Sequence, residues 1–199
     1  MDELHAITKV AGEAGLRVHM DGARFANALV KLDCSPAEMT WKVGVDIVSF
    51  GTTKNGTMNA EAVVVFDAET AAVVRYLHKR AGFLQSKMRF AAAQLTTYVR
   101  DNLWLDNARR ANGNAERLAR AFASTAGARL AHSVDANEIF VHLDAATLAK
   151  LEDCAIHLRR WPYSDNDLYR LVTAFCDSDS LLFRIETALA ATQATAETD

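Results

Sequence analysis

The sequence contains few cysteines and no closely spaced cysteine pair. Among 199 residues only Cys34, Cys154 and Cys176 occur. Three cysteines this far apart indicate neither a disulfide framework nor a zinc site, so we expect no metal. We expect buried, reduced thiols in a cytoplasmic protein.

Long apolar runs and blocks of basic residues are also missing. No run of about 18 apolar residues occurs, and residues 1–10 lack the basic start and apolar stretch of a secretory signal. The net charge is −3, without a dense cluster of Lys or Arg. We therefore expect no membrane span, no leader and no nucleic-acid partner. The composition, 50% hydrophobic and 24% charged, is typical of a globular protein.

The first third of the chain alternates helical and strand patterns. Short, nearly continuous apolar strands separated by helices are typical of a mostly parallel sheet covered on both faces, so the fold class is predicted to be α/β. A helix, a turn and a buried strand at the start also suggest that the chain begins partway through such a fold. The predicted helices cover residues 2–14, 23–32 and 35–41, and the predicted strands cover residues 16–20, 45–50 and 62–66.

The rest of the chain changes from helical to mixed patterns. A helical signal runs over residues 68–124, where we expect Gly82 and Gly113 to interrupt it. We predict residues 1–85 to be part of a large domain, and residues 86–195 to be a long linking helix with a small α+β domain. That small domain is expected to have strands at 129–130, 137–143, 155–158 and 168–173, and helices at 145–153 and 180–190.

Three polar side chains follow two of the predicted strands. Asp21 comes directly after the first strand, with Arg24 three residues later, and Lys54 lies just beyond the second strand. Ligands of open α/β sheets bind beyond the carboxyl ends of strands. A lysine amine can hold the aldehyde of pyridoxal phosphate (PLP) as a Schiff base, and a carboxylate can keep the cofactor's ring nitrogen protonated. Lys54 and Asp21 suit these two tasks.

Simpler explanations exist for each of these residues. A single lysine after a strand is usually a solvated loop residue, and an aspartate before glycine commonly forms a turn with its own backbone. Asp21 and Arg24 have the spacing of a local ion pair. His19 is expected to pack rather than to take part in catalysis. Thr52 or Thr53 could bind a cofactor phosphate or only the local backbone.

Three motifs in one order carry a family resemblance. The segments HMDGARFANA (19–28), DIVSFGTTKNG (46–56) and YRLVT (169–173) resemble those of the low-specificity L-threonine aldolases, which are fold-type I PLP-dependent enzymes. The resemblance implies the carboxy-terminal part of a fold-type I large domain followed by a small α+β domain. It also implies an amino-acid substrate and a homo-oligomer when complete.

The resemblance assigns a role to each matching residue. Lys54 carries PLP as a Schiff base, Asp21 pairs with the pyridinium nitrogen, and Arg24 donates to the phenolic oxygen. Arg170 binds the substrate α-carboxylate, for which a planar fork of donors is suited. The family's phosphate-binding loop has no match here, so we expect weak PLP binding and an uncovered apolar face on the sheet.

The function predicted from the sequence is cleavage of the Cα–Cβ bond of β-hydroxy-α-amino acids, giving glycine and acetaldehyde from threonine. Another fold-type I lyase or transferase is an alternative, since the aspartate and the lysine are common to many of them. A second alternative is a non-catalytic fragment that pairs with another chain.

Overall fold

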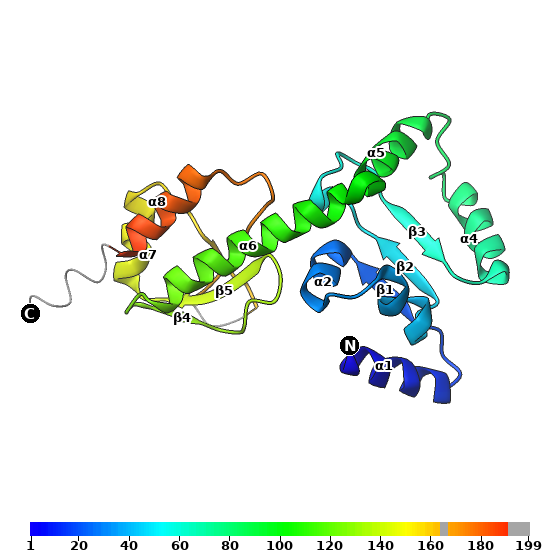
Figure 1. Cartoon of the computed structure of the whole chain (residues 1–199), viewed down its shortest axis with the longest axis horizontal. Coiled ribbons are helices and arrows are strands. Elements are labelled where there is room, and N and C mark those ends of the chain that lie inside the picture. The colour runs from blue at the N-terminus through cyan, green and yellow to red at the C-terminus, as the bar shows by residue number, and fades with distance from the viewer. Residues whose placement is uncertain (164–166, 191–199) are drawn as a thin grey trace, which may run out of the picture. The chain divides into compact units, whose positions relative to one another are not determined.

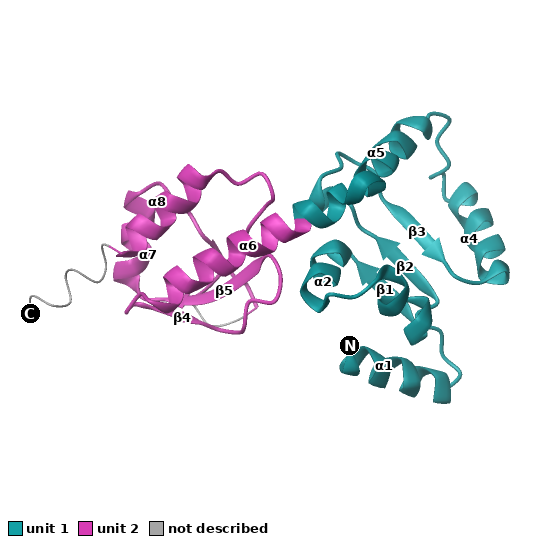
Figure 2. Ribbon diagram, viewed as in Figure 1, with its two compact units in different colours: residues 1–107 teal, residues 108–199 magenta. Residues whose placement is uncertain are grey.

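A computed structural model describes residues 1–163 and 167–190. The chain forms two compact units, residues 1–107 and residues 108 onward (Figure 2). The predicted boundary near residue 85 concerns the domains of the complete family fold and stays a prediction. Residues 191–195, which the predicted second domain includes, lie outside the described part.

The first unit contains one small sheet and several helices (Figure 1). Most predicted elements are present, although the first two strands begin two or three residues later than expected. Three short 3-10 helices also occur: η1 (Trp41–Val43), η2 (Thr53–Asn55) and η3 (Arg100–Asn102). The remaining elements are α1 (Asp2–Glu13), β1 (His19–Gly22), α2 (Phe25–Leu32), α3 (Pro36–Met39), β2 (Ile47–Phe50), β3 (Ala62–Val65), α4 (Ala68–Arg80), α5 (Arg89–Val99) and the start of α6 (Leu103–Ala123).

The sheet of the first unit has the strand order β1-β2-β3 and is mixed. β1 and β2 are parallel, whereas β2 and β3 are antiparallel, with Phe50 opposite Ala62. The prediction of a mostly parallel sheet therefore does not hold for these three strands. A parallel pair needs a long crossover, and the connection over residues 51–61 instead reverses the chain. The α/β class itself is confirmed.

Local sequence explains several element boundaries. Ser35 caps α3 in a capping box, in which its hydroxyl accepts from the Glu38 amide and the Glu38 carboxylate accepts from the Ser35 amide. Gly82 falls in the break between α4 and α5, as predicted. Gly113 does not interrupt the helix, because α6 continues through it. A single glycine inside a helix costs only about 1 kcal/mol, which the packing of a long helix can offset.

The core of the first unit is a cluster of aromatic rings between the sheet and α6. Phe25 stacks on Trp104 with ring centroids 6.3 Å apart, and Phe50 meets both rings edge-on. Trp104 and Tyr98 are 9% and 2% exposed. These rings anchor the end of β2 and the start of α6 to each other.

The sheet is not covered on both faces, contrary to the sequence prediction. On β3 the side chain of Val63 is 56% exposed and that of Val64 is 39% exposed. Helices α1 and α4 contain no buried residue. The exposures agree instead with the expectation, drawn from the family resemblance, of an uncovered apolar face.

Two glycines let the ends of β1 and β2 approach closely. A Cβ atom added to Gly51 would lie 2.6 Å from the Ala23 Cα, and one added to Gly22 would lie 2.6 Å from the Ser49 carbonyl oxygen. The Gly51 amide donates to the Gly22 carbonyl at 3.1 Å. The strand ends that carry Asp21 and precede Lys54 are thus held in backbone contact.

The second unit is a four-stranded antiparallel sheet with the order β4-β5-β7-β6. Helices α6, α7 and α8 lie on one face of this sheet, where Phe122, Leu151 and Leu182 pack against Ile139 and Val141 of β5 (Figure 1). Its further elements are β4 (Ala128–Leu130), β5 (Glu138–Leu143), α7 (Ala145–Asp153), β6 (Arg159–Arg160), β7 (Leu168–Val172) and α8 (Asp179–Ala190).

Two sequence predictions for this region are wrong. No strand covers residues 155–158, because the chain turns at Ala155, whose φ is +56°, and β6 forms only afterwards. Cys154 and Cys176 are exposed rather than buried, and Cys34 is half-buried. The described residues include no helix long and apolar enough to cross a membrane, and no cluster of three potential metal ligands.

An ion pair makes the stability of the second unit depend on pH. Arg117 donates to both oxygens of Glu186, each at 2.6 Å, and this bonding lowers the pKa of the Glu186 carboxyl. The stabilisation is therefore present above the unfolded-state pKa and is lost as the pH falls through the folded-state pKa. We expect Glu186→Gln to lower the urea midpoint at pH 7 and to have little effect near pH 3. Glu152→Gln, on an exposed position, is the control; an equal loss at both pH values would contradict this.

The glycine contact predicts a steric penalty. Gly51→Ala should lower the free energy of unfolding by about 1–3 kcal/mol, because backbone atoms of Ala23 cannot yield to a methyl group without moving β1 from β2. Urea denaturation of the first unit measures the change. Gly12→Ala is the matched control: no atom lies within 4 Å of the added Cβ, and a helical alanine should stabilise by about 0.5–1 kcal/mol. Equal effects of the two substitutions would refute the contact.

Candidate active site

Lys54 lies in the short helix η2, a few residues beyond the end of β2. Its side chain is exposed. The segment over residues 51–61 that contains it connects β2 to β3. A primary amine at a strand end, with free access from solvent, is available to a carbonyl compound.

The residues before Lys54 are anchored within that segment. Thr52 is completely buried; its hydroxyl donates to the Ala60 carbonyl and lies 2.8 Å from the Thr57 hydroxyl. The Glu61 carboxylate accepts from the amides of Thr52 and Thr53, each at 3.1 Å, and from the Thr53 hydroxyl. Both threonine hydroxyls therefore bond within the loop, and the suggestion that one of them binds a phosphate is not supported.

The residue after Lys54 is anchored to the aromatic core. Asn55 is 4% exposed. Its side-chain Nδ2 donates to the Tyr98 hydroxyl at 2.7 Å and to the Trp104 carbonyl at 2.8 Å. Asn107 in turn donates to the Asn55 carbonyl at 2.9 Å. Burial raises the pKa of the Tyr98 phenol, so this acceptor stays uncharged at neutral pH. Lys54 is thus an exposed residue between two fixed neighbours.

Asp21 and Arg24 lie together at the end of β1. Asp21 is exposed and is paired in register with Ser49 of β2. Its Oδ1 accepts from the Ala23 amide at 3.0 Å, which is the local turn considered from sequence, and leaves the other oxygen for a ligand. Arg24 precedes α2 and is half-buried. Both side chains line one cavity of ≈ 430 Å³.

The structure joins these residues through the backbone of the strand ends. The contact between Gly22 and Gly51 sets the segment after β1 directly against the segment that leads to Lys54. Lys54 itself does not line the cavity of Asp21 and Arg24. Asp21, Arg24 and Lys54 therefore follow or end neighbouring strands of one sheet, and their chemical roles remain predictions.

The sequence prediction for His19 is wrong, and Glu61 was not singled out from the sequence. His19 is exposed rather than packed, and its Nε2 lies 2.8 Å from the Ser49 hydroxyl. Residues two apart in a strand share a face, so His19 is on the face of Asp21. Glu61 belongs to no motif, and only the antiparallel pairing of β2 and β3 reveals that it reaches the loop of Lys54.

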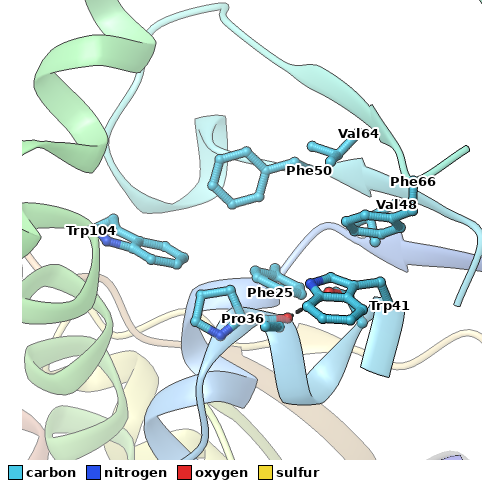
Figure 3. Close-up of a pocket in the computed structure, with 10 residues that line it drawn as sticks. Phe25, Pro36, Trp41, Val48, Phe50, Val64, Phe66 and Trp104 are labelled. Carbon is cyan, nitrogen blue, oxygen red and sulfur yellow. Dashed lines mark hydrogen bonds between the residues drawn. The ribbon is translucent and has the colours of Figure 1, made fainter. Parts of the chain in front are cut away.

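A second cavity in the first unit has a different character. Its volume is ≈ 340 Å³, and the rings of Phe25, Phe50, Trp41, Phe66 and Trp104 surround it (Figure 3). No titratable side chain lines it. Such a cavity can take apolar groups but cannot transfer protons or hold an anion, so it is not the candidate active site.

Arg170 is in the second unit, on β7 opposite Phe140 of β5. Its guanidinium donates from one terminal nitrogen to Glu138 and lies 5.5 Å over the ring of Trp161. Among the described residues its buried Nε has no acceptor. The stacked and paired guanidinium is held in a defined orientation, which suits a residue that binds a planar anion.

The family of this chain follows from comparison with known proteins. A model described as beta-eliminating lyase matches residues 1–146. Two curated proteins named low specificity L-threonine aldolase are 43% identical: one from Pseudomonas aeruginosa over 162 residues, 81% of this chain and 45% of that protein, and one from a Pseudomonas species over 152 residues, 76% and 44%. The chain therefore spans less than half the length of these relatives.

Solved structures give the same assignment. The threonine aldolase of Leishmania major matches with a TM-score of 0.85 and 25% identity, covering 96% of this chain and 56% of that one. A methionine gamma lyase from Micromonospora echinospora, at 18% identity and a TM-score of 0.63, shares the fold. The chain belongs to the beta-eliminating lyase family, whose members depend on pyridoxal phosphate.

Proposed function

We propose that this chain provides the lysine-bearing part of a threonine aldolase, which cleaves β-hydroxy-α-amino acids such as threonine to glycine and an aldehyde. The observation that carries the proposal is Lys54, an exposed amine on a loop whose two neighbours are fixed, beside the strand end that bears Asp21. The Pseudomonas relatives with that activity in their names support the choice of reaction.

The residues present fit pyridoxal phosphate in their chemistry. Lys54 would hold its aldehyde, Asp21 its ring nitrogen and Arg24 its phenolic oxygen. Gly22 lines the cavity of Asp21 and Arg24 with backbone alone. No described residue is assigned to the phosphate, since the Thr52 and Thr53 hydroxyls bond within the loop.

Each side chain then has one task in the cleavage. The bound cofactor supplies an electron sink for the pair left on Cα when the Cα–Cβ bond breaks. The Asp21 carboxylate keeps a proton on the ring nitrogen, and the Arg170 guanidinium orients the substrate by its α-carboxylate. The Lys54 amine, once released, can carry the proton that returns to Cα. No residue described here is assigned to the β-hydroxyl proton.

The finer points of the architecture belong to the same proposal. We infer that residues 1–85 are part of the large domain of a fold-type I enzyme, whose complete sheet is mostly parallel, and that residues 86–195 form the linking helix and the small domain. A homo-oligomer and a cytoplasmic location fit the exposed apolar residues of β3 and the small-molecule substrate.

A non-catalytic role is a second candidate. Val63 and Val64 of β3 and Ile7 and Val10 of α1 are exposed, with the last two at 60% and 65%, so this chain presents apolar surface for another polypeptide. Such a role needs no cofactor. Another lyase chemistry is the third candidate, since the methionine gamma lyase has the same fold.

Labelling of Lys54 tests the proposal. Because PLP binding by this chain is expected to be weak, PLP is added at high concentration. We expect the visible absorbance of an imine, and borohydride reduction with peptide mapping to place most of the label on Lys54. Lys54→Ala should remove most of the band. Lys42→Ala is the matched control, because Lys42 is also an exposed lysine in a three-residue 3-10 helix. Equal labelling of both lysines would overturn the assignment.

Complementation separates the candidate reactions. The chain would be co-expressed with the part of the Pseudomonas aeruginosa relative that it does not match, and products from threonine and from methionine would be compared. Formation of acetaldehyde and glycine from threonine supports the aldolase. Arg170→Ala should then raise the KM for threonine by about tenfold or more, because the α-carboxylate loses its partner. A stable complex without any turnover supports the non-catalytic role, and an α-keto acid from methionine supports the other lyase.

A further inference from the structure

We propose that Glu61 is a positioning residue for Lys54: its carboxylate holds the backbone immediately before the lysine and so fixes the direction in which the amine leaves the loop. This role rests on the proposed function of Lys54. It concerns a residue outside the sequence motifs that identify the family.

Glu61 uses both of its oxygens on two successive residues. Oε2 accepts from the Thr52 amide at 3.1 Å, and Oε1 accepts from the Thr53 amide at 3.1 Å and from the Thr53 hydroxyl. Successive amides that point the same way form a concavity for an anion. A carboxylate is the acceptor such a concavity holds best, because hydrogen bonds to a charged group are about twice as strong as neutral ones.

The strand pairing brings Glu61 to this place. Phe50 is opposite Ala62 in the β2–β3 pair, so Glu61, one residue earlier, continues the register toward the residues that follow β2. The neighbouring bond from the Thr52 hydroxyl to the Ala60 carbonyl closes the same loop. The loop is therefore tied across its base on the side that precedes Lys54.

The other side of Lys54 is tied independently. Asn55 bonds to Tyr98 and to the Trp104 backbone, and these contacts do not involve Glu61. Loss of the Glu61 contacts would loosen η2 at Thr53, while the Thr52 hydroxyl bond to Ala60 and the contacts of Asn55 stay in place. The expected result is a lysine that is still exposed but no longer fixed in direction, which differs from global unfolding.

Glutamine is the informative replacement for Glu61. It has almost the same shape, but only one of its two terminal atoms can accept a hydrogen bond, so it cannot serve both amides. Thr53→Val tests the same contact from the other partner, since it removes the hydroxyl bond and keeps the amide. Thr53→Ser keeps both and is the conservative control.

Two measurements on the full chain test the role of Glu61. In Glu61→Gln, hydrogen exchange at the Thr52 and Thr53 amides should become about tenfold faster, as loss of one charge-assisted bond predicts. Exchange at the Asp46 amide, which donates to the Val18 carbonyl outside the loop, should stay unchanged. The ratio of PLP label on Lys54 to label on Lys42 should fall by about tenfold or more, because a misdirected amine loses its advantage over an ordinary exposed lysine.

Controls make each outcome decisive. Glu13→Gln, an exposed change in the same unit, and Thr53→Ser should behave as wild type, whereas Thr53→Val should show a smaller loss of the same kind. Unchanged amide exchange or an unchanged label ratio in a folded Glu61→Gln overturns the role of Glu61. If Glu61→Gln does not fold, Thr53→Val decides by the same criteria. Wild-type chain without preference for Lys54 overturns the proposed function, and the role of Glu61 with it.

Discussion

The chain reverses direction between β2 and β3, and the antiparallel pair places Phe50 opposite Ala62. The contacts that hold the residues before Lys54 depend on this reversal. It brings the Glu61 carboxylate and the Ala60 carbonyl to the residues that precede the lysine. The parallel pairing of β2 with β1 then sets the same loop beside Asp21. One short hairpin therefore converts a lysine that sequence alone would leave in a solvated loop into a side chain with fixed surroundings.

The residues of the candidate site could be predicted from the sequence, but the contacts that hold them in place could not. Lys54 and Asp21 follow apolar strands, and that pattern needs no tertiary knowledge. The anchors of Lys54 were invisible because they come from the far end of the loop and from helices distant in sequence, as with Glu61 and Tyr98. The parallel order of β3 was misjudged because β-branched runs look alike in either direction. The burial of its faces was overestimated, since an apolar run does not reveal whether a covering element is present.

The loop at Lys54 and the outer surface of the first unit differ in how well their side chains are packed. The loop at Lys54 is held by hydrogen bonds on both sides of the lysine, and the rings of Phe25, Phe50 and Trp104 contact one another. The outer sides of β3, α1 and α4 in contrast expose valine, isoleucine and aromatic side chains. The chain matches less than half the length of the Pseudomonas relatives, and its loop at Lys54 is held by contacts within the first unit alone.

The bare contact of Gly22 with Gly51 also determines which misfolded states the sheet can form. If β1 slipped by one residue against β2, Met20 would take the position of Asp21, and every side chain of the strand would change faces. The slip would also bring Asp21 to the position of Gly22, where a Cβ atom would lie 2.6 Å from the Ser49 carbonyl oxygen. The glycine pair thus disfavours the wrong register of β1 against β2. A sheet in that register would lack the Asp21 carboxylate at its native position, and its strands could not approach to the native distance.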